Sequence, residues 1–303
     1  MRRPAVSIPL VIAFLCGTTL HAQEEHPVRS LTNDPAQQGF PSWSPDGQTI
    51  VFSSGSQDIP EQTGLWKIPA DGGEPWQFTE FIGEHPDWSP DGHYIVFDAD
   101  SGNSVKLISS QGGAPIRVDS RDAEVFRGGN PYWAPDGRRI AFRGGSNLWL
   151  VDISTGEAGI VFTREDMYPI PGCWSRDGTD VFVTLRGSGT NESEIWRVPA
   201  SGAEASQILF ETDLVYRYMD LSPDGTLLAF TACKERDCDL WIGAVTGGRP
   251  VQLAFHPAYD DTPRWSPDGK EIAFTSTRSG AFDIWIVEPN LDKIRAGLRA
   301  QVE

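Results

Sequence analysis

Short apolar runs alternate with compact turn sequences along almost the whole chain, and the same pairing returns six times. A Trp-Ser-Pro-Asp-Gly sequence, or a degraded form of it, begins at Trp43, Trp88, Trp133, Trp174, Leu221 and Trp265. Successive copies start 41 to 47 residues apart, a period typical of the blades of a β-propeller. Proline presets one dihedral angle of such a turn and glycine takes its left-handed position. Each copy therefore predicts a tight hairpin.

Apolar runs after each turn predict the remaining strands of a blade. Residues 50–52 and 272–274 are typical of the second strand, with apolar residues on both faces, as expected of a strand covered on both sides. Residues 65–68 represent the third strand, and residues 75–78, after a pair of glycines, the fourth. Ten of the eleven tryptophans occupy two positions of this repeat. We predict that they pack between blades.

The ends of the chain complete the pattern. The last copy has no fourth strand after it, whereas residues 27–32 resemble a fourth strand and precede the first copy. We therefore expect an all-β fold, a six-bladed β-propeller of four-stranded antiparallel blades, with the ring closed by the N-terminal strand joining the last blade. The propeller is expected to span residues 23–290. Residues 291–303, with apolar side chains at helical spacing, predict a short C-terminal helix or tail.

These repeats resemble a known family. The Trp-Ser-Pro-Asp-Gly hairpin, the Ile-Trp strand and the Gly-Gly turn are similar to the WD40-like repeats of TolB-type six-bladed propellers. The resemblance implies a protein partner and a place in the Tol–Pal system of the envelope. TolB-type proteins also carry an N-terminal α/β domain before the propeller. We expect this chain to have the propeller only, which argues against that specific role.

The first residues have the order of a secretory signal peptide. Arg2 and Arg3 precede an apolar run, and Ala22 supplies a small residue at the expected cleavage position. The run is short for a membrane span and contains Pro9, although an N-terminal anchor is the alternative. We predict that residues 1–22 are removed, that no transmembrane segment remains, and that the protein is periplasmic or secreted.

Composition and charge argue against several classes of function. A net charge of −17 argues against nucleic acid, which requires a basic face, and against anionic lipid. The sequence contains no nucleophile elbow, zinc-protease motif, P-loop or dinucleotide fingerprint. The histidines show no metal-site spacing, and residues 98–103 resemble a calcium loop only weakly, so we interpret them as a hairpin. We predict no cofactor and no metal, and expect a monomer.

One face of the propeller is the candidate working face. The second-to-third hairpins and the blade-to-blade loops share it, and the variation in repeat length falls there. Loops on a rigid scaffold are the usual place for recognition, and these loops are acidic and aromatic. The candidate binding residues near the central channel are His85, Asp87, Tyr132, Tyr218, Asp220, Asp261 and Arg264.

This face predicts a non-enzymatic exported scaffold that binds a protein or peptide partner. The alternative is a propeller enzyme, a lyase or hydrolase acting on carbohydrate or peptide at the channel mouth, with His85, Asp87 and Asp220 as its polar groups. A charged rim that only keeps the protein soluble is the remaining interpretation.

Two smaller features have structural explanations. Cys233 and Cys238 flank a four-residue loop, so we predict a disulfide in an oxidising compartment, with Cys173 as a buried free thiol. Asp side chains in turns bond nearby backbone amides. We therefore assign a structural role to the six turn aspartates, Asp46, Asp91, Asp136, Asp177, Asp224 and Asp268.

Overall fold

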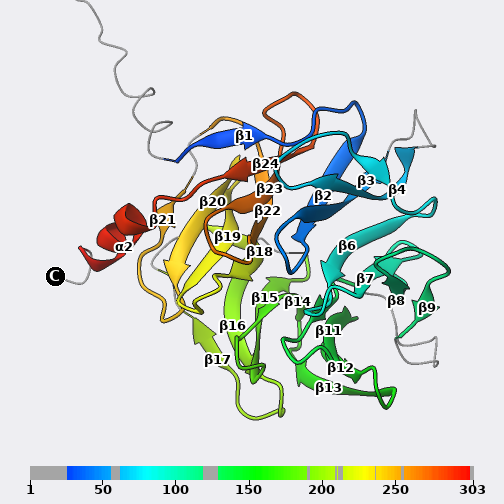
Figure 1. The fold of residues 1–303 in the computed structure, drawn as a ribbon. Coiled ribbons are helices and arrows are strands. Elements are labelled where there is room, and N and C mark those ends of the chain that lie inside the picture. Colours follow the sequence, from blue (N-terminus) through cyan, green and yellow to red (C-terminus); the bar gives the residue numbers. More distant parts are fainter. Residues whose placement is uncertain are drawn as a thin grey trace, which may run out of the picture.

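The strands form six four-stranded antiparallel sheets arranged around a common centre (Figure 1). The computed structural model describes residues 26–55, 62–118, 129–189, 192–208, 210, 214–235, 237–253 and 256–300. The expected all-β six-bladed propeller is confirmed. The predicted signal peptide at residues 1–22 lies outside the described residues.

Each sheet is a meander whose first strand lies nearest the centre. Blade 1 contains β2 (Gln37–Trp43), β3 (Thr49–Gly55), β4 (Gly64–Pro69) and β5 (Trp76–Gln77). Blade 2 contains β6 (Gly83–Trp88), β7 (Tyr94–Ala99), β8 (Ser104–Ser109) and β9 (Ile116–Arg117). Blade 3 contains β10 (Tyr132–Trp133), β11 (Arg139–Gly144), β12 (Asn147–Asp152) and β13 (Glu157–Thr163).

The second half repeats this order. Blade 4 contains β14 (Met167–Trp174), β15 (Asp180–Gly187), β16 (Ser193–Pro199) and β17 (Ser206–Ile208). Blade 5 contains β18 (Val215–Leu221), β19 (Leu227–Lys234), β20 (Asp237–Ala244) and β21 (Val251–Gln252). Blade 6 contains β22 (Asp260–Trp265), β23 (Ile272–Ser276), β24 (Asp283–Val287) and β1 (Val28–Ser30).

The N-terminal strand closes the ring, as predicted. β1 pairs antiparallel with β24, with Val28 opposite Val287. The pairing continues beyond β1, where Leu31 N donates to Ile284 O at 2.9 Å and Glu288 N donates to Pro27 O at 2.9 Å. The inner strands contact one another in the order β2, β6, β10, β14, β18 and β22, and β22 contacts β2 again.

The repeated turns are held by a serine and an aspartate. In blade 1, Ser44 Oγ donates to Asp46 Oδ1 at 2.6 Å, and Thr49 N donates to Ser44 Oγ at 2.9 Å. The glycine of this turn, Gly47, has φ 71°. In blade 4, the Ser175 hydroxyl is the main cause that lowers the pKa of Asp177 to about 2. The turn aspartates therefore act locally, within their own hairpins.

The core lies between blades. Its largest buried side chains are phenylalanines of the second strands, among them Phe52, Phe142 and Phe274. The indole of Trp43 also links blades, because its Nε1 donates to Arg264 O of blade 6 at 3.0 Å. Trp174 Nε1 makes the same contact with Tyr132 O of blade 3, at 3.1 Å. Trp43 and Trp174 thus each join their own blade to the preceding one by a hydrogen bond.

The C-terminal segment forms helix α2 (Leu291–Arg299), capped by the side chain of Asn290 and anchored by the buried Ile294. None of the described helices is both long and apolar enough to cross a membrane. Cys233 and Cys238 lie opposite each other on β19 and β20 and form a disulfide with a sulfur–sulfur distance of 2.03 Å. Cys173 is free and buried.

Candidate functional site

Several inner strands share a bulge at equivalent positions of the repeat. Phe40, His85, Asn130 and Thr262 have φ between 48° and 56°. Each is followed by proline and stands three residues before the repeated tryptophan. In β2, β6 and β22 the ladder register shifts at this point. A bulge re-aims side chains, and here it brings Phe40, His85 and Thr262 to the channel.

The residue just before each repeated Trp or Leu lies inside the channel, where Arg264 joins three blades. Its guanidinium forms an ion pair with Asp87 and lies 4.7 Å from the centre of the Tyr132 ring. Arg264 Nε is 4.0 Å from Asp220 Oδ2. We call Asp87, Tyr132, Asp220 and Arg264 the channel cluster.

The two carboxylates of the channel cluster also accept hydrogen bonds from the backbone of the next blade. Asp87 Oδ2 accepts a hydrogen bond from Trp133 N at 2.8 Å, and Asp220 Oδ2 accepts one from Trp265 N at 2.8 Å. Burial raises the pKa of both carboxyl groups, and the Arg264 charge opposes this rise. The carboxylate oxygens are therefore engaged with backbone and arginine.

Three aromatic rings cover the channel cluster. The Phe40 and His85 rings are 3.9 Å apart between centroids, and Tyr218 lies 5.7 Å from Phe40. The Tyr218 hydroxyl oxygen is 3.5 Å from His85 Nε2. We call these three residues the aromatic lid. The space left between the lid and the channel cluster is only about 10 Å³, about enough for one water molecule, so the channel is closed here.

A much larger cavity, of about 900 Å³, opens where the inner strands begin. We call it the mouth cavity. Its polar side is built by three residues: Arg217 Nη1 donates to the Tyr259 hydroxyl, and that hydroxyl donates to Asp261 Oδ2 at 2.9 Å. Its other lining residues include Gln37, Phe40, Ile82, Glu84 and Phe282. The cavity thus combines aromatic and aliphatic surface with charges of both signs.

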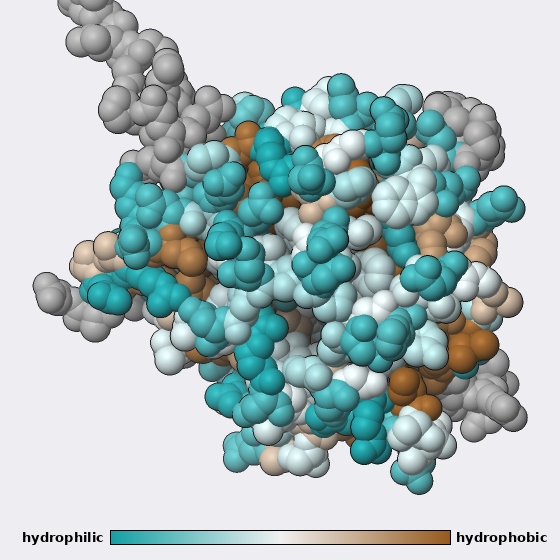
Figure 2. Space-filling model, viewed as in Figure 1, coloured by the Kyte–Doolittle hydropathy of each residue, from teal (hydrophilic) through white to brown (hydrophobic). Residues whose placement is uncertain are grey.

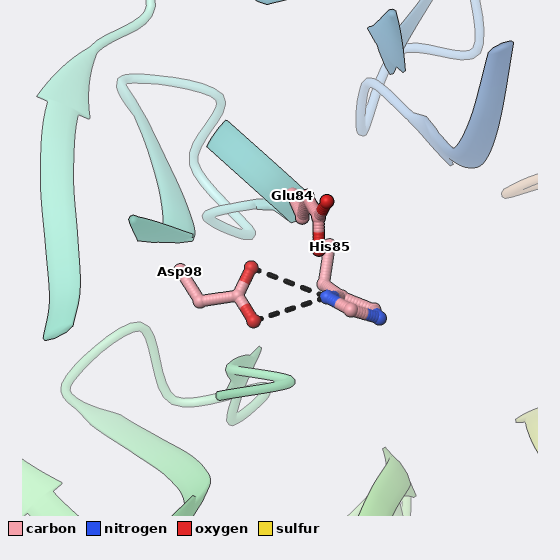
Figure 3. Close-up of side chains that lie close together, drawn as sticks. All are labelled: Glu84, His85 and Asp98. Carbon is pink, nitrogen blue, oxygen red and sulfur yellow. Dashed lines mark hydrogen bonds and ion pairs between the residues drawn. The ribbon is translucent and has the colours of Figure 1, made fainter. Parts of the chain in front are cut away.

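A second group of polar side chains lies beside the mouth cavity in blade 2. Figure 3 shows the Asp98 carboxylate directed at the Nδ1 edge of His85, with Glu84 next to them. The two Asp98 oxygens are 3.1 and 3.2 Å from Nδ1. Donor atoms of Glu84, His85 and Asp98 all lie within 4.8 Å of one another. Asp98 Oδ2 also accepts a hydrogen bond from Asn130 N of blade 3, at 3.3 Å.

The structure gathers all seven predicted residues around the channel but gives them different positions. Four form the channel cluster, His85 and Tyr218 belong to the aromatic lid, and Asp261 lines the mouth cavity. The candidate working face is therefore partly filled by its own side chains. Sequence reasoning missed Arg217, and it considered Asp98 only within the weak calcium-loop resemblance of residues 98–103. The signal for Arg217 is a basic residue between two tyrosines, Tyr216 and Tyr218, on an inner strand of an acidic chain.

Figure 2 shows a mostly hydrophilic face, with hydrophobic residues mainly towards the edge of the disc. Among the described residues, the large exposed apolar side chains include Trp76, Ile116 and Ile160, which belong to outer strands of three different blades.

Comparison with known proteins supports a TolB-like propeller. No family model matches the chain. The Tol-Pal system protein TolB of Anaeromyxobacter dehalogenans is 31% identical over 131 residues, which cover 41% of this chain and 28% of that protein. The match therefore spans under a third of the length of such curated relatives.

Solved structures extend the likeness over most of the chain. A structure assigned as TolB of Agrobacterium tumefaciens has a TM-score of 0.65 and 20% identity, covering 86% of this chain and 92% of that one. Oligogalacturonate lyase of Vibrio parahaemolyticus has a TM-score of 0.61 and 14% identity, covering 87% and 94%. At these identities the likeness shows the fold alone. The resemblance to TolB-type propellers is confirmed.

Proposed function

We propose that this TolB-like propeller is an exported, non-enzymatic scaffold that binds an extended peptide segment of a partner protein in the mouth cavity. The observation that carries the proposal is a cavity of about 900 Å³ at the start of the inner strands of blades 1, 2 and 6, on the candidate working face and beside the closed channel. Such a volume is typical of ligand pockets. It admits a few side chains rather than a folded domain.

The lining of the mouth cavity suits a peptide. Phe40, Ile82 and Phe282 offer apolar surface for one or two hydrophobic side chains. Arg217, Tyr259 and Asp261 offer hydrogen-bonding groups that fix orientation. Because the carboxylates of Glu84 and Asp261 outnumber the single cation Arg217 among these lining residues, and the whole chain has a charge of −17, a segment with basic residues is electrostatically favoured.

Two further points support a scaffold in the cell envelope. The curated relatives matched in sequence are named Tol-Pal system proteins, and the apparent signal peptide predicts export. The carboxylates required by the enzyme alternative, Asp87 and Asp220, bond backbone amides and approach Arg264 inside the closed channel. They are not presented to a substrate at the mouth.

Paired surface variants test this function. Ile82 lines the mouth cavity and is 57% exposed, whereas Ile116 is 60% exposed on the outer strand β9. Ile82→Arg should reduce capture of the partner from an envelope extract at least tenfold, and Ile116→Arg should leave it unchanged. A synthetic peptide from the captured partner should show the same difference in fluorescence anisotropy.

Equal capture by the two variants would refute the peptide-binding proposal. So would turnover in a screen of oligosaccharides and peptides, if Asp87→Asn abolished that turnover while the variant kept the melting temperature of the parent protein.

A further inference from the structure

We infer that Glu84, His85 and Asp98 form a binding site for a divalent transition-metal ion, such as Zn²⁺ or Mn²⁺, beside the mouth cavity. Glu84 and His85 are consecutive on the inner strand β6, and Asp98 faces them from β7 of the same blade. Their three donor atoms lie within 4.8 Å of one another. The set contains one imidazole nitrogen and two carboxylates, the donors that such ions take from proteins.

The spacing of the donors fits coordination. Protein nitrogen and oxygen ligands bind Zn²⁺ at about 2.0–2.2 Å, so two ligands at right-angled or tetrahedral positions are about 3.0–3.4 Å apart. His85 Nδ1 and Asp98 Oδ2 are 3.1 Å apart. The ion therefore takes the place of the hydrogen between these atoms, and the neutral imidazole carries its N–H on Nε2 instead. Glu84, which is exposed, completes the set by rotating its side chain.

The charges around Asp98 also favour a cation. Its side chain is 5% exposed, and no lysine or arginine among the described residues forms an ion pair with it. By contrast, the buried carboxylates Asp87 and Asp260 are paired with Arg264 and Arg278. Buried charges in proteins are paired or coordinate metals. A divalent ion supplies Asp98 with the countercharge that Asp87 and Asp260 receive from arginine.

The surroundings of His85 hold the ring in a position suited to ligation. Phe40 packs on it, with ring centroids 3.9 Å apart. Nε2 faces the Tyr218 hydroxyl at 3.5 Å, and a ligating histidine ordinarily uses its second nitrogen for such a contact. Ions reach the site from the mouth cavity, which Glu84 lines. Because Ca²⁺ and Mg²⁺ prefer oxygen ligands only, we expect them to bind much more weakly.

The experiment is a titration of the purified, chelator-treated chain with Zn²⁺ and, separately, Mn²⁺, monitored by calorimetry and by the melting temperature. We expect one equivalent to bind with a rise in melting temperature. Glu84→Gln should weaken binding at least tenfold, and His85→Gln should abolish it. The control is His93→Gln, because His93 is exposed and follows the turn aspartate Asp91 on the opposite face; it should bind as the parent protein does.

Absence of a stoichiometric site for both ions would overturn the inference, as would equal affinities for the parent protein and Glu84→Gln. Because Glu84 is exposed, this variant tests the site even if replacing His85 disturbs the fold. An equal loss in His93→Gln would assign the binding to scattered surface histidines. The titration contains no partner, so its failure leaves the peptide-binding proposal standing.

Discussion

Arg264 differs in charge from the residues at the equivalent position of the other blades, and it contacts three of those blades. The position before the repeated Trp or Leu is occupied around the channel by Ser42, Asp87, Tyr132, Cys173, Asp220 and Arg264. The only cation in this set lies against its two anions, and removing one partner of a buried ion pair leaves a charge without compensation. Complementary side chains at equivalent positions of the repeat therefore meet at the centre of the ring, and they close the channel.

Asp239 on β20 predicts a dependence of stability on pH. Burial, with added repulsion from Asp237 and Asp260, raises the pKa of its carboxyl group to about 7. The folded protein therefore holds a proton that the unfolded chain releases near pH 4. The stabilising contribution of this proton is complete below that pH and is lost as the pH rises towards 7.

Replacing Asp239 with Asn removes this dependence. We expect Asp239→Asn to be more stable than the parent protein by about 1–2 kcal/mol at pH 8, a figure reduced for solvent screening of a half-buried group. At about pH 3, below the ordinary pKa of an aspartate, the two proteins should be nearly equally stable, because Asp239 is then largely neutral in both states. Urea unfolding between about pH 3 and pH 8 measures this. Parallel pH profiles would contradict it.

The six hairpins differ in one informative place. Ala134 in blade 3 stands where the other turns have serine, and it is fully buried. In blade 1 the Ser44 hydroxyl both donates to Asp46 and accepts from Thr49 N. Ala134→Ser should restore these two bonds and raise the free energy of unfolding by about 1 kcal/mol. Ser44→Ala should lower it by a similar amount. Chemical denaturation of both variants measures these changes. A destabilised Ala134→Ser would contradict the proposed role of the serine in holding the turn.

The hairpin sequences predict strand order and pairing but not the shape of the inner strands. The turn fixes Trp88 opposite Ile95, and from there an unbroken ladder would pair Asp87 with Val96 and so on. The bulge between Glu84 and Asp87 shifts the register by one residue, so that Glu84 lies opposite Asp98. Spacing along the chain does not reveal such a shift, and for that reason the Glu84, His85 and Asp98 group could not be found from it.

For the outer strands, too, the sequence predicts the position of a strand but not its length. The segment 75–78 was expected to be a strand, whereas β5 covers only Trp76–Gln77. One hydrogen bond, from Phe78 N to Leu65 O at 2.8 Å, continues the contact beyond the strand. Alternation of residue types locates such a strand, but its length depends on the twist of the outermost blade edge, which sequence patterns do not encode.

The ring as a whole depends on one junction between distant parts of the chain. β1 is only three residues long, yet it supplies the outer strand of blade 6. Arg29 reinforces the junction, because its Nη2 donates to Ala70 O of blade 1 and to Glu271 of blade 6, both at 2.9 Å. A propeller closed in this way has no free edge between its first and last blades. Opening this junction would separate strands that line the mouth cavity.

A disulfide across the junction tests how far stability depends on it. Val28 and Val287 face each other in the antiparallel pairing, and the bonds at Leu31 and Pro27 identify them as a non-hydrogen-bonded pair, the geometry that brings side chains closest. Val28→Cys combined with Val287→Cys closes a loop of nearly the whole ring. We expect about 2–4 kcal/mol of added stability in the oxidised protein, lost on reduction, whereas the parent protein under the same reductant controls for Cys233–Cys238. The unfolding rate shows whether the ring opens at this junction. If unfolding begins in another blade, the oxidised and reduced variants will unfold at the same rate, and the junction will not be the point on which the ring depends.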